Sequence, residues 1–510
     1  MERIALIDIG SNTIRLVIFE YNRMIGLNEI QNIKTPARLS QYLTDDQQMT
    51  DEGIDVLTDT LKSFKKVSDK YKVDALYPIA TAAIRQSANQ DVILQRVKDA
   101  IDVDIQIVPE EDEAYYGYYA VTHTTSVPDG VTVDIGGGST EITLFKDKKL
   151  IHAHSFPFGV VTLKRKFFNG EPHNDKNSIK KMEKFLSEQF KSLDWIQDQD
   201  IPLVGIGGSA RNVARIHQSN LSYPIAGVHG YTMDKKDIQK VYDMIRKSSR
   251  DDLTNLDGLS QDRVDIILPA VSVFKTLYEE IDATQFTFSR KGLREGYVMS
   301  ELSKTYKDEF DSKKVRQDAL FHLANEYKIE SKGAEQRVRL AEMLFNQLHD
   351  LGKLKVSDNL KELFLKGAYL YYLGSFIDAD SSSQHTFYII SNSSINGFTH
   401  KNRVKLALLA SFKNKTLLKF YSHEIGWFDS KEIDEIQALG GIIKFVNAMN
   451  VSNINSVSQL DLQPAKKKGF NLFVHYKGEP VAEEYQANRQ KKHIERILKE
   501  DMNITFTKTL

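Results

Sequence analysis

Three glycine-rich turns, each directly after a short apolar run, constrain the fold of this chain more than any other feature. They are DIGSN at residues 8–12, DIGGGS at 134–139 and GIGGS at 205–209. The first two lead into β-rich segments, residues 13–19 and 141–145, so both are expected at the tips of hairpins. The third leads into residues 210–217, which read as the start of a helix. The repeated strand, turn and strand predict two related lobes.

Around these turns, helical and strand patterns follow one another. Residues 51–71, 178–193 and 235–247 have helical spacing of apolar side chains, and residues 75–79 form a short β-rich run. This mixture predicts an α/β core that extends to about residue 302. The 510 residues are too many for one hydrophobic core, and about three or four domains are expected.

The rest of the chain changes character twice. Residues 313–445 have long helical periodicities and a single strand-like stretch, 387–390, which predicts an all-helical domain. From about residue 456 the pattern returns to short strands, 471–476 and 504–507, around one charged helix, 480–499. The chain therefore ends in a small predicted α/β domain.

Composition excludes several classes of site. Cysteine is absent, which rules out a disulfide scaffold, a thiol nucleophile and a thiolate zinc site. No signal peptide is evident at the start, and the longest apolar run, residues 367–377, is too short to cross a membrane. A cytoplasmic protein without a membrane partner is expected. The net charge is −1, so no nucleic-acid partner is expected and any polyanion must bind to locally clustered lysine and arginine.

The turns themselves suit phosphate. Consecutive backbone N–H groups and serine or threonine hydroxyls form a concavity that binds phosphate oxygens. The turns lack the GxxxxGK[ST] pattern of a P-loop and the GxGxxG pattern of a dinucleotide fold. A single such turn can simply be a tight hairpin, but three of them favour a phosphate clamp.

Carboxylates border two of the turns. Asp8 and Asp134 each end an apolar strand where a turn begins, and Glu141 opens the next strand. An aspartate there can merely cap the turn through its side chain. Two lobes that bring such carboxylates together would instead hold Mg²⁺, which prefers carboxylate, water and phosphate oxygens.

Two further segments carry candidate groups. Arg85 follows a run of small residues, and its guanidinium could bind a phosphate, although a helical arginine is more often solvated. Residues 109–116 place four acids ahead of an aromatic helix. Acids favour a helix N-terminus through the helix dipole, so composition alone does not select one of them as a base.

Together these motifs resemble the exopolyphosphatase/guanosine pentaphosphate phosphohydrolase family of the actin-like superfamily. The resemblance rests on seven motifs in family order: residues 8–15, 80–89, 134–141, 158–163, 205–211, 262–265 and 292–296. It implies a two-lobed actin-like (ribonuclease H-like) α/β core, an all-helical HD-like domain and a small α/β C-terminal domain. The implied domains are residues 1–125, 126–302, 303–450 and 451–510.

The resemblance also implies roles for individual residues. Glu113, which precedes Ala114, takes the place of the catalytic glutamate, with Glu141 beside it. Mg²⁺ or Mn²⁺ would be held by Asp134, Glu141 and Asp8, with a monovalent cation such as K⁺ as a further candidate. Phosphate oxygens would be bound by Ser11, Asn12, Thr13, Arg85, Gly136, Gly137, Gly138, Ser139, Gly207, Gly208 and Ser209. Glu110 departs from the family, which has a glycine there.

The helical region contains a decoy. His349-Asp350 looks like the metal-binding dyad of HD phosphohydrolases, but following the family's register places the dyad at Tyr371-Tyr372. The upstream histidine should then fall in residues 333–338, which contain none. The resemblance therefore implies an HD-like domain whose metal site is lost, with His349 at a surface or helix end.

The predicted function is exopolyphosphatase activity, the removal of terminal phosphates from inorganic polyphosphate by water attack, in a homodimer. The alternatives are hydrolysis of guanosine pentaphosphate to the tetraphosphate, as in the stringent response, a non-catalytic nucleotide sensor, and an ATP-dependent kinase or chaperone. The pair Glu113 and Glu141 argues against the last two. The C-terminal basic residues would hold a long polyanion: Lys466, Lys467, Lys468, Arg489, Lys491, Lys492 and Arg496.

Overall fold

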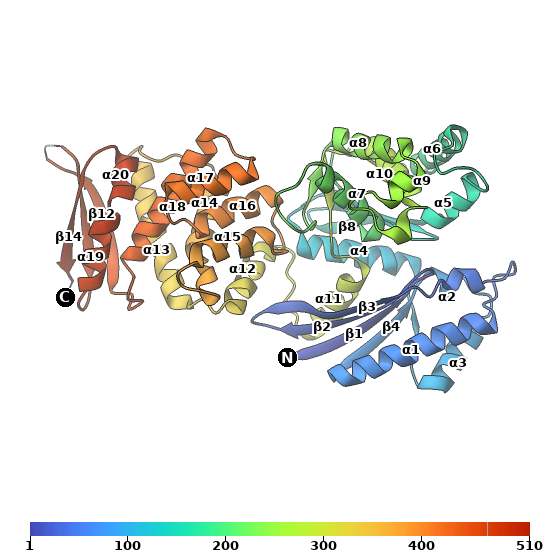
Figure 1. Cartoon of the computed structure of the whole chain (residues 1–510). Helices are drawn as coiled ribbons and strands as arrows, with labels where there is room; N and C mark the ends of the chain where they lie inside the picture. Colours follow the sequence, from blue (N-terminus) through green and yellow to red (C-terminus); the bar gives the residue numbers. More distant parts are fainter. Residues whose placement is uncertain (467, 510) are drawn as a thin grey trace. The chain divides into compact units, whose positions relative to one another are not determined.

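The computed structural model describes residues 1–466 and 468–509. The chain divides into two compact units (Figure 1). Unit 1 comprises residues 1–223 and 228–319, and unit 2 comprises residues 224–227 and 320–510. The boundary therefore lies beyond the one expected at residue 302, and the predicted helical and C-terminal domains share one unit.

Unit 1 contains two sheets with the same arrangement, as the repeated turns predict. The first sheet has the order β3-β2-β1-β4-β5 and the second β10-β11-β9-β6-β7-β8. In each, three antiparallel strands continue into parallel neighbours, β1 with β4 and β6 with β9. The strands of the first sheet are β1 (Glu2–Ile9), β2 (Ile14–Asn22), β3 (Gly26–Thr35), β4 (Ala75–Ala80) and β5 (Gln106–Ile107). Those of the second are β6 (Gly130–Ile135), β7 (Thr140–Lys146), β8 (Lys149–Phe156), β9 (Leu203–Ile206), β10 (Thr232–Met233) and β11 (Phe286–Phe288).

Helices cover these sheets, and their apolar faces form the cores. The first sheet and its helices form lobe I, and the second sheet and its helices form lobe II. The helices of lobe I are η1 (Leu39–Tyr42), α1 (Asp51–Tyr71), α2 (Ala82–Arg85) and α3 (Gln90–Ile101). Lobe II has α5 (Val160–Phe167), α6 (Lys176–Lys191), α7 (Gly207–Asn220), α8 (Lys235–Lys247), α9 (Arg250–Thr254), η2 (Gln261–Arg263) and α10 (Ile267–Glu280). Helix α1 is an example of such an apolar face, in which four residues at helical spacing are all buried: Ile54, Leu57, Leu61 and Phe64.

Two helices are exchanged between the lobes, in that each packs on the lobe other than the one it follows in the chain. Helix α4 (Glu110–Thr124) follows the last strand of lobe I but packs on β6, β7 and β8 of lobe II. Helix α11 (Leu293–Thr305) follows lobe II, yet its Tyr297, Val298 and Leu302 belong to the core around β1. The two helices also pack on each other, between the two sheets in Figure 1. A Cβ at Gly296 would lie 1.9 Å from the Tyr116 carbonyl oxygen, so only glycine permits this close approach.

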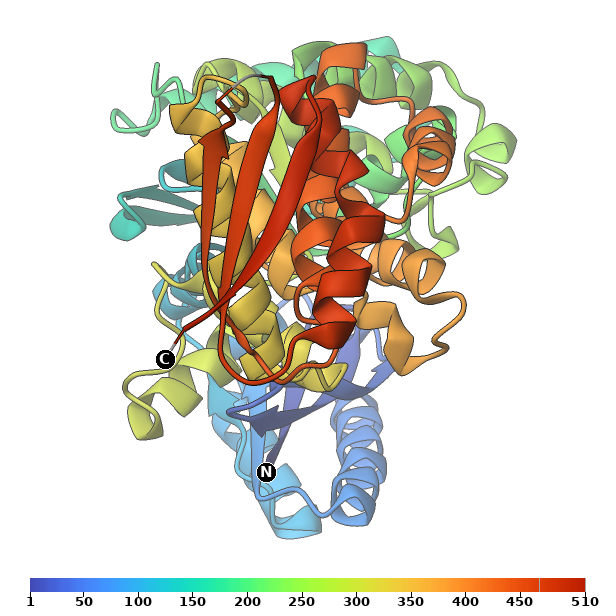
Figure 2. The same ribbon diagram turned by 90° about the vertical axis from the view of Figure 1, so that its left-hand side faces the viewer.

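Unit 2 begins with helices and ends with a three-stranded sheet. Its helices are the end of α12 (Val315–Glu326), α13 (Ser331–Asp350), α14 (Asp358–Tyr369), η3 (Leu373–Phe376), α15 (Ser382–Asn392), α16 (His400–Ala410), α17 (Lys415–Ile425) and α18 (Ser430–Ala448). The sheet has the order β12-β13-β14, with β12 (Val457–Pro464), β13 (Phe470–Tyr476) and β14 (Met502–Lys508). Figure 2 faces this sheet, together with α19 (Val481–Gln490) and α20 (Lys492–Leu498).

Two expectations for this unit differ from the structure. The strand-like stretch 387–390 lies inside α15, where Thr386, Ile389 and Ile390 are buried at helical spacing, so packing overrides their β preference. The single charged helix expected over 480–499 is two consecutive helices, α19 and α20.

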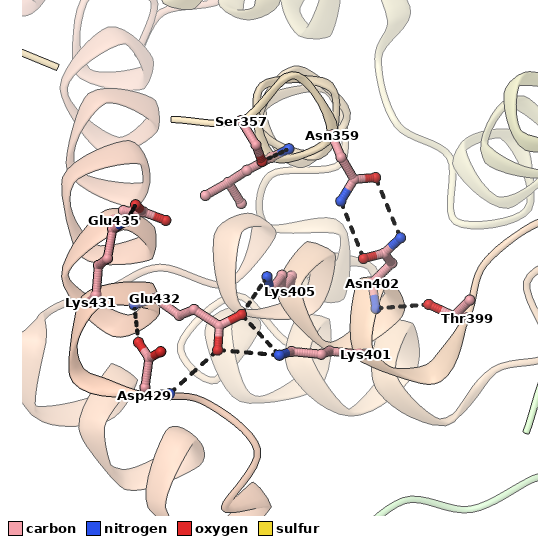
Figure 3. A network of polar contacts seen from close by, with 11 residues as sticks. Ser357, Asn359, Thr399, Lys401, Asn402, Lys405, Asp429, Lys431, Glu432 and Glu435 are labelled. Carbon is pink, nitrogen blue, oxygen red and sulfur yellow. Dashed lines mark hydrogen bonds and ion pairs between the residues drawn. The ribbon is translucent and has the colours of Figure 1, made fainter. Parts of the chain in front are cut away.

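Polar side chains join the helices of unit 2. Glu432 opens α18 in a capping box with Asp429 and binds Lys401 and Lys405 of α16 at 2.9 and 2.8 Å (Figure 3). Beside them, the amides of Asn359 and Asn402 pair reciprocally. Although partial burial opposes it, hydrogen bonds from the two lysines lower the pKa of Glu432 to about 2. These contacts fix α18, on which the terminal helices pack.

Candidate active site

The three glycine turns meet at one cavity of about 250 Å³ in unit 1. Thirteen of the predicted site residues line it: Asp8, Ser11, Asn12, Thr13, Glu113, Asp134, Gly136, Gly137, Gly138, Ser139, Glu141, Gly207 and Gly208. Both lobes thus contribute, as expected from their hairpin tips. Arg85 and Ser209 were also predicted to bind phosphate, but they are not among the residues that line the cavity.

The carbonyl groups of each hairpin turn accept hydrogen bonds from neighbouring backbone N–H groups. In the first turn the Ser11 and Asn12 carbonyls accept from Ser40 N and Arg38 N, both at 3.0 Å. In the second, the Gly136 and Gly137 carbonyls accept from the first turn of α5. Because these carbonyls are already bonded, the donors that the turns offer to the cavity are N–H groups and hydroxyls, which bind phosphate oxygens.

The third turn is the N-terminus of α7 and lies against an acid. Gly207 has φ +81°, and a Cβ there would lie 2.5 Å from Asp134 Oδ1. Glycine is therefore required both for the left-handed backbone and for the close approach. The N-terminus of α7 faces the same cavity, and such a helix end favours bound anions.

Glu113 lies in the first turn of α4 and is held by Arg85. Arg85 Nη1 is 3.0 Å from Glu113 Oε2 and also donates to the Val108 carbonyl at 2.8 Å, while Nη2 lies 3.3 Å from Glu110. Arg85 therefore contacts carboxylates where we expected it to contact phosphate. Burial raises the pKa of Glu113 to about 7, although Arg85 opposes the shift. A carboxylate with such a pKa suits proton abstraction near neutral pH.

Two more carboxylates lie nearby, of which Glu141 is buried and Asp134 half-buried. Burial raises the pKa of Asp134 to about 6. Burial and the charge of Glu113 raise the pKa of Glu141 well above its usual range, and the Ser155 hydroxyl donates to Glu141 at 3.1 Å. Asp8 is paired with Arg294 at 3.0 Å. In the described part of the chain, no group of three acidic or histidine side chains forms a metal site by itself.

Basic side chains on the cavity wall form the part of the site that the sequence did not single out. Six of them line it: Arg15, Lys34, Arg211, Arg263, Arg290 and Arg294. Burial and neighbouring arginines lower the pKa of Arg211 to about 10. Arg263 donates to the Ser209 hydroxyl at 3.0 Å, so Ser209 orients an arginine on the wall. A concentration of cations in a partly buried cavity fits a ligand with several negative charges.

The HD-like decoy has no metal-site geometry. His349 and Asp350 end α13 and are 57% and 79% exposed. At the register position of the lost dyad, Tyr371 is buried and stacks on Tyr372, and the buried Arg337 guanidinium lies 5.8 Å from the Tyr371 ring. Arg337 donates to the carbonyls of Ala368 and Tyr369 and to Asn447. A buried arginine therefore lies beside the tyrosines at the position where the resemblance places the lost dyad.

Family models match most of the chain. The model described as "Ppx/GppA phosphatase family" matches residues 17–305, and "Ppx/GppA phosphatase, domain III" matches residues 315–475. The chain belongs to the Ppx/GppA phosphatase family. This confirms the resemblance, and the protein is a phosphatase of that family with the expected two-lobed α/β core.

Individual relatives agree with this assignment. The chain is 25% identical over 412 residues to a guanosine-5'-triphosphate,3'-diphosphate pyrophosphatase of Pseudoalteromonas atlantica, covering 79% of this chain and 78% of the relative. A crystal structure of the Aquifex aeolicus family member is 28% identical, with a TM-score of 0.54 over 60% of this chain and 98% of that one. An exopolyphosphatase from Cytophaga hutchinsonii shares the fold at 22% identity and a TM-score of 0.55, over 59% of this chain and 98% of that one.

Among the described helices, none combines the length and the apolar character needed to cross a bilayer.

Proposed function

We propose that this family phosphatase hydrolyses the terminal phosphoanhydride bond of inorganic polyphosphate. The observation that carries the proposal is the cavity wall, where six basic side chains and three glycine turns surround the half-buried Glu113. Cations and turn N–H groups bind the oxygens of successive phosphates, and Glu113 lies where a water can be activated. Such a site works by positioning and charge stabilisation.

Glu113 is the proposed general base. It takes a proton from water as the water oxygen attacks the terminal phosphorus, and the bond from that phosphorus to the bridging oxygen breaks. The products are orthophosphate and a chain shorter by one phosphate. Arg85 holds the Glu113 carboxylate and favours its ionised form, whereas burial favours the protonated form. These opposing effects leave Glu113 with a pKa of about 7, so that it can accept a proton from water near neutral pH.

A divalent cation fits the acidic side of the cavity. Glu141 is buried and Asp134 half-buried. Their raised pKa values reflect desolvation and repulsion, from Asp8 at Asp134 and from Glu113 and Asp134 at Glu141. A Mg²⁺ ion would relieve both effects, and water or substrate phosphate would complete its oxygen ligands. We propose Asp134 and Glu141 as its main ligands, with Asp8 shared between the metal and Arg294. When bound, the ion neutralises phosphate charge.

The cavity lining favours polyphosphate over a nucleotide. Among the described residues that line it, none is aromatic, whereas a guanine base commonly stacks on an aromatic ring. Glycine and arginine are the commonest lining residues, and glycine N–H groups and guanidinium groups recognise phosphate without selecting a base. This supports a substrate composed of phosphate groups alone.

Guanosine pentaphosphate is the second candidate, because the relative from Pseudoalteromonas atlantica is named for that activity. It would use the same turns and the same base. The two substrates are separated by measuring kcat/KM for phosphate release from long polyphosphate and from guanosine pentaphosphate, side by side with Mg²⁺. A higher value for polyphosphate is expected. A clear preference for guanosine pentaphosphate would reverse the assignment.

A further inference from the structure

Unit 2 contains a cluster of basic side chains, distant in sequence from the proposed active site, which we call the α18–α20 cluster. It consists of Lys413, Lys444, Arg489, Lys492, His493 and Arg496. Lys444 belongs to α18, Arg489 to α19, and Lys492, His493 and Arg496 to α20, and both terminal helices pack on α18. The Lys444 ammonium donates to the Lys413 carbonyl at 2.6 Å, which brings Lys413 to the same place.

The cations of this cluster lie close to one another rather than to acids. In the described part of the chain, none of these five lysines and arginines has a carboxylate within ion-pair distance. Burial lowers the pKa of Lys444, and the charges of Lys492, Lys413 and Arg489 lower it further. Lys444 is half-buried, whereas Lys413, Arg489, Lys492 and Arg496 are exposed. The repulsion at the half-buried Lys444 therefore costs free energy, which a bound anion would offset.

His493 is the buried member of the cluster. Only 8% of its surface is exposed, its ring packs against Gly441 and edge-on to Phe412, and its Nε2 is buried with no hydrogen-bond partner. Burial and then the charges of Lys444, Lys492 and Arg496 lower its pKa to about 4. A buried nitrogen without a partner is uncommon in folded proteins, and a bound ion or water is one explanation for it.

The cluster differs from the basic groups that the sequence suggested. Lys491 is not part of it, because its ammonium pairs with Glu495 at 3.0 Å and donates to the Met502 carbonyl. Lys466 and Lys468 lie in the turn between β12 and β13, and Lys467 lies outside the described residues. Lys413, Lys444 and His493, by contrast, are brought in by the fold alone.

We propose that the α18–α20 cluster is a second oxyanion site, which binds a phosphate or diphosphate group among Lys444, Lys492 and Arg496, near His493. Five donors from three helices and a loop suit a compact ligand with two or more negative charges. A free pyrophosphate ion and a short segment of a phosphate polymer share this chemistry.

The test follows His493 itself. The full-length chain, carrying Glu113→Gln so that the probe is not consumed, is labelled at the histidine ring carbons and titrated with pyrophosphate. Among the 13 histidines, His493 is assigned by the loss of its signal in His493→Gln. Anion binding should shift this signal and raise the His493 pKa by at least about one unit, because the anion removes the repulsion of the cations.

A variant gives an independent readout. Lys492 and Arg496 are exposed, so Lys492→Gln with Arg496→Gln should leave the fold intact. Calorimetric titration of pyrophosphate should lose affinity at least about tenfold for one binding event while the active-site event persists. Lys332→Gln with Lys355→Gln, two exposed lysines elsewhere in unit 2, is the matched control and should bind as the parent does.

The two sources of the ligand are separated by repeating the His493 titration with long polyphosphate. A response to pyrophosphate identifies a site for a small free anion, and a response to polyphosphate alone identifies a site for the polymer. Either supports an oxyanion site. If neither probe moves the His493 signal and the double variant binds as the parent does, the proposal is wrong.

Discussion

At the scale of single residues, the proposed chemistry depends on three carboxylates that share one buried space. Burial raises the pKa values of Glu113, Asp134 and Glu141. Repulsion adds to the shift, from Asp8 at Asp134, from Asp134 and Asp8 at Glu113, and from Glu113 and Asp134 at Glu141. The three predictions below concern Glu113, its partner Arg85 and Asp134, and they separate proton abstraction, its tuning and metal binding.

Glu113→Gln should lower kcat about 10²–10⁴-fold, as loss of a general base does, with KM nearly unchanged. Steady-state phosphate release measures both constants. The matched control is Glu111→Gln, which changes an exposed acid two residues away and should keep near-normal turnover. Equal turnover in the two variants would move the base elsewhere.

Arg85→Gln should shift the acidic limb of the pH profile of kcat/KM to higher pH by about one unit or more. The Arg85 guanidinium lowers the pKa of Glu113, so its removal raises that pKa and leaves less ionised base at a given pH. Arg85→Lys keeps the charge and should show a smaller shift. In a Glu113→Gln background the residual activity should not respond to Arg85→Gln, and a response there would contradict the pairing.

Asp134→Asn should raise the Mg²⁺ concentration required for half-maximal activity at least about tenfold, because it removes a charged ligand. Activity is measured across a Mg²⁺ titration after treatment with a chelator. Full activity of the unmodified protein in excess chelator would overturn the metal assignment.

At the scale of elements, the second glycine turn depends on the helix behind it. The Gly159 N-cap of α5 lies so close to that turn that a Cβ would be 2.4 Å from the Gly136 carbonyl oxygen and 2.6 Å from Gly137 C. Backbone atoms cannot move aside as the end of a flexible side chain can, so the turn and α5 form one rigid piece.

Gly159→Ala should therefore lower the free energy of unfolding by about 1–3 kcal/mol, as overpacking does, and should reduce activity by displacing the turn. Thermal and urea unfolding measure the first effect and phosphate release the second. Gly138→Ala is the stability control, since nothing lies within 4 Å of a Cβ there. A Gly159→Ala protein as stable as the Gly138→Ala protein would contradict this explanation.

Elements with strong local patterns were predictable from the sequence, and the packing of the exchanged helices α4 and α11 was not. Helices 51–71 and 235–247 were predicted with the bounds that the structure has, because their apolar spacing and caps act locally. The exchange of α4 and α11 depends on long-range packing that no local pattern encodes. Within the site, the turn glycines were predictable from sequence, whereas Arg211, Arg263 and Arg294 could not be told from solvated arginines until the lobes brought them together.

At the scale of the whole molecule, every lining residue of the proposed active site belongs to unit 1. The structure also moves the end of that unit from the boundary expected at residue 302. The rings of Tyr306 and Phe310 lie 4.9 and 5.6 Å from that of Tyr21, and Lys148 donates to the Ser312 carbonyl. A chain that ends at Ser303 would lose these contacts.

A chain that ends at Ala319 should therefore fold and hydrolyse short polyphosphates, whereas one that ends at Ser303 should be less stable. On long polyphosphate the Ala319 chain should lose affinity and accumulate intermediates, while the full chain should weaken steeply with salt. Sizing gels at two salt concentrations measure both effects. If the Ala319 chain degrades long polymers with unchanged affinity and no intermediates, unit 2 does not hold substrate.

The exchange of α4 and α11 has a mechanical meaning. The chain passes from one lobe to the other twice, just before each of these helices, and the helices lock together at Gly296. Because both connections lie at one place, we expect them to act as a hinge about which the lobes rotate without sliding past each other. Arg85 lies on lobe I, and Glu113 lies on the helix that packs on lobe II. Opening the hinge would separate this pair, so the proton affinity of the base would report whether the lobes are closed.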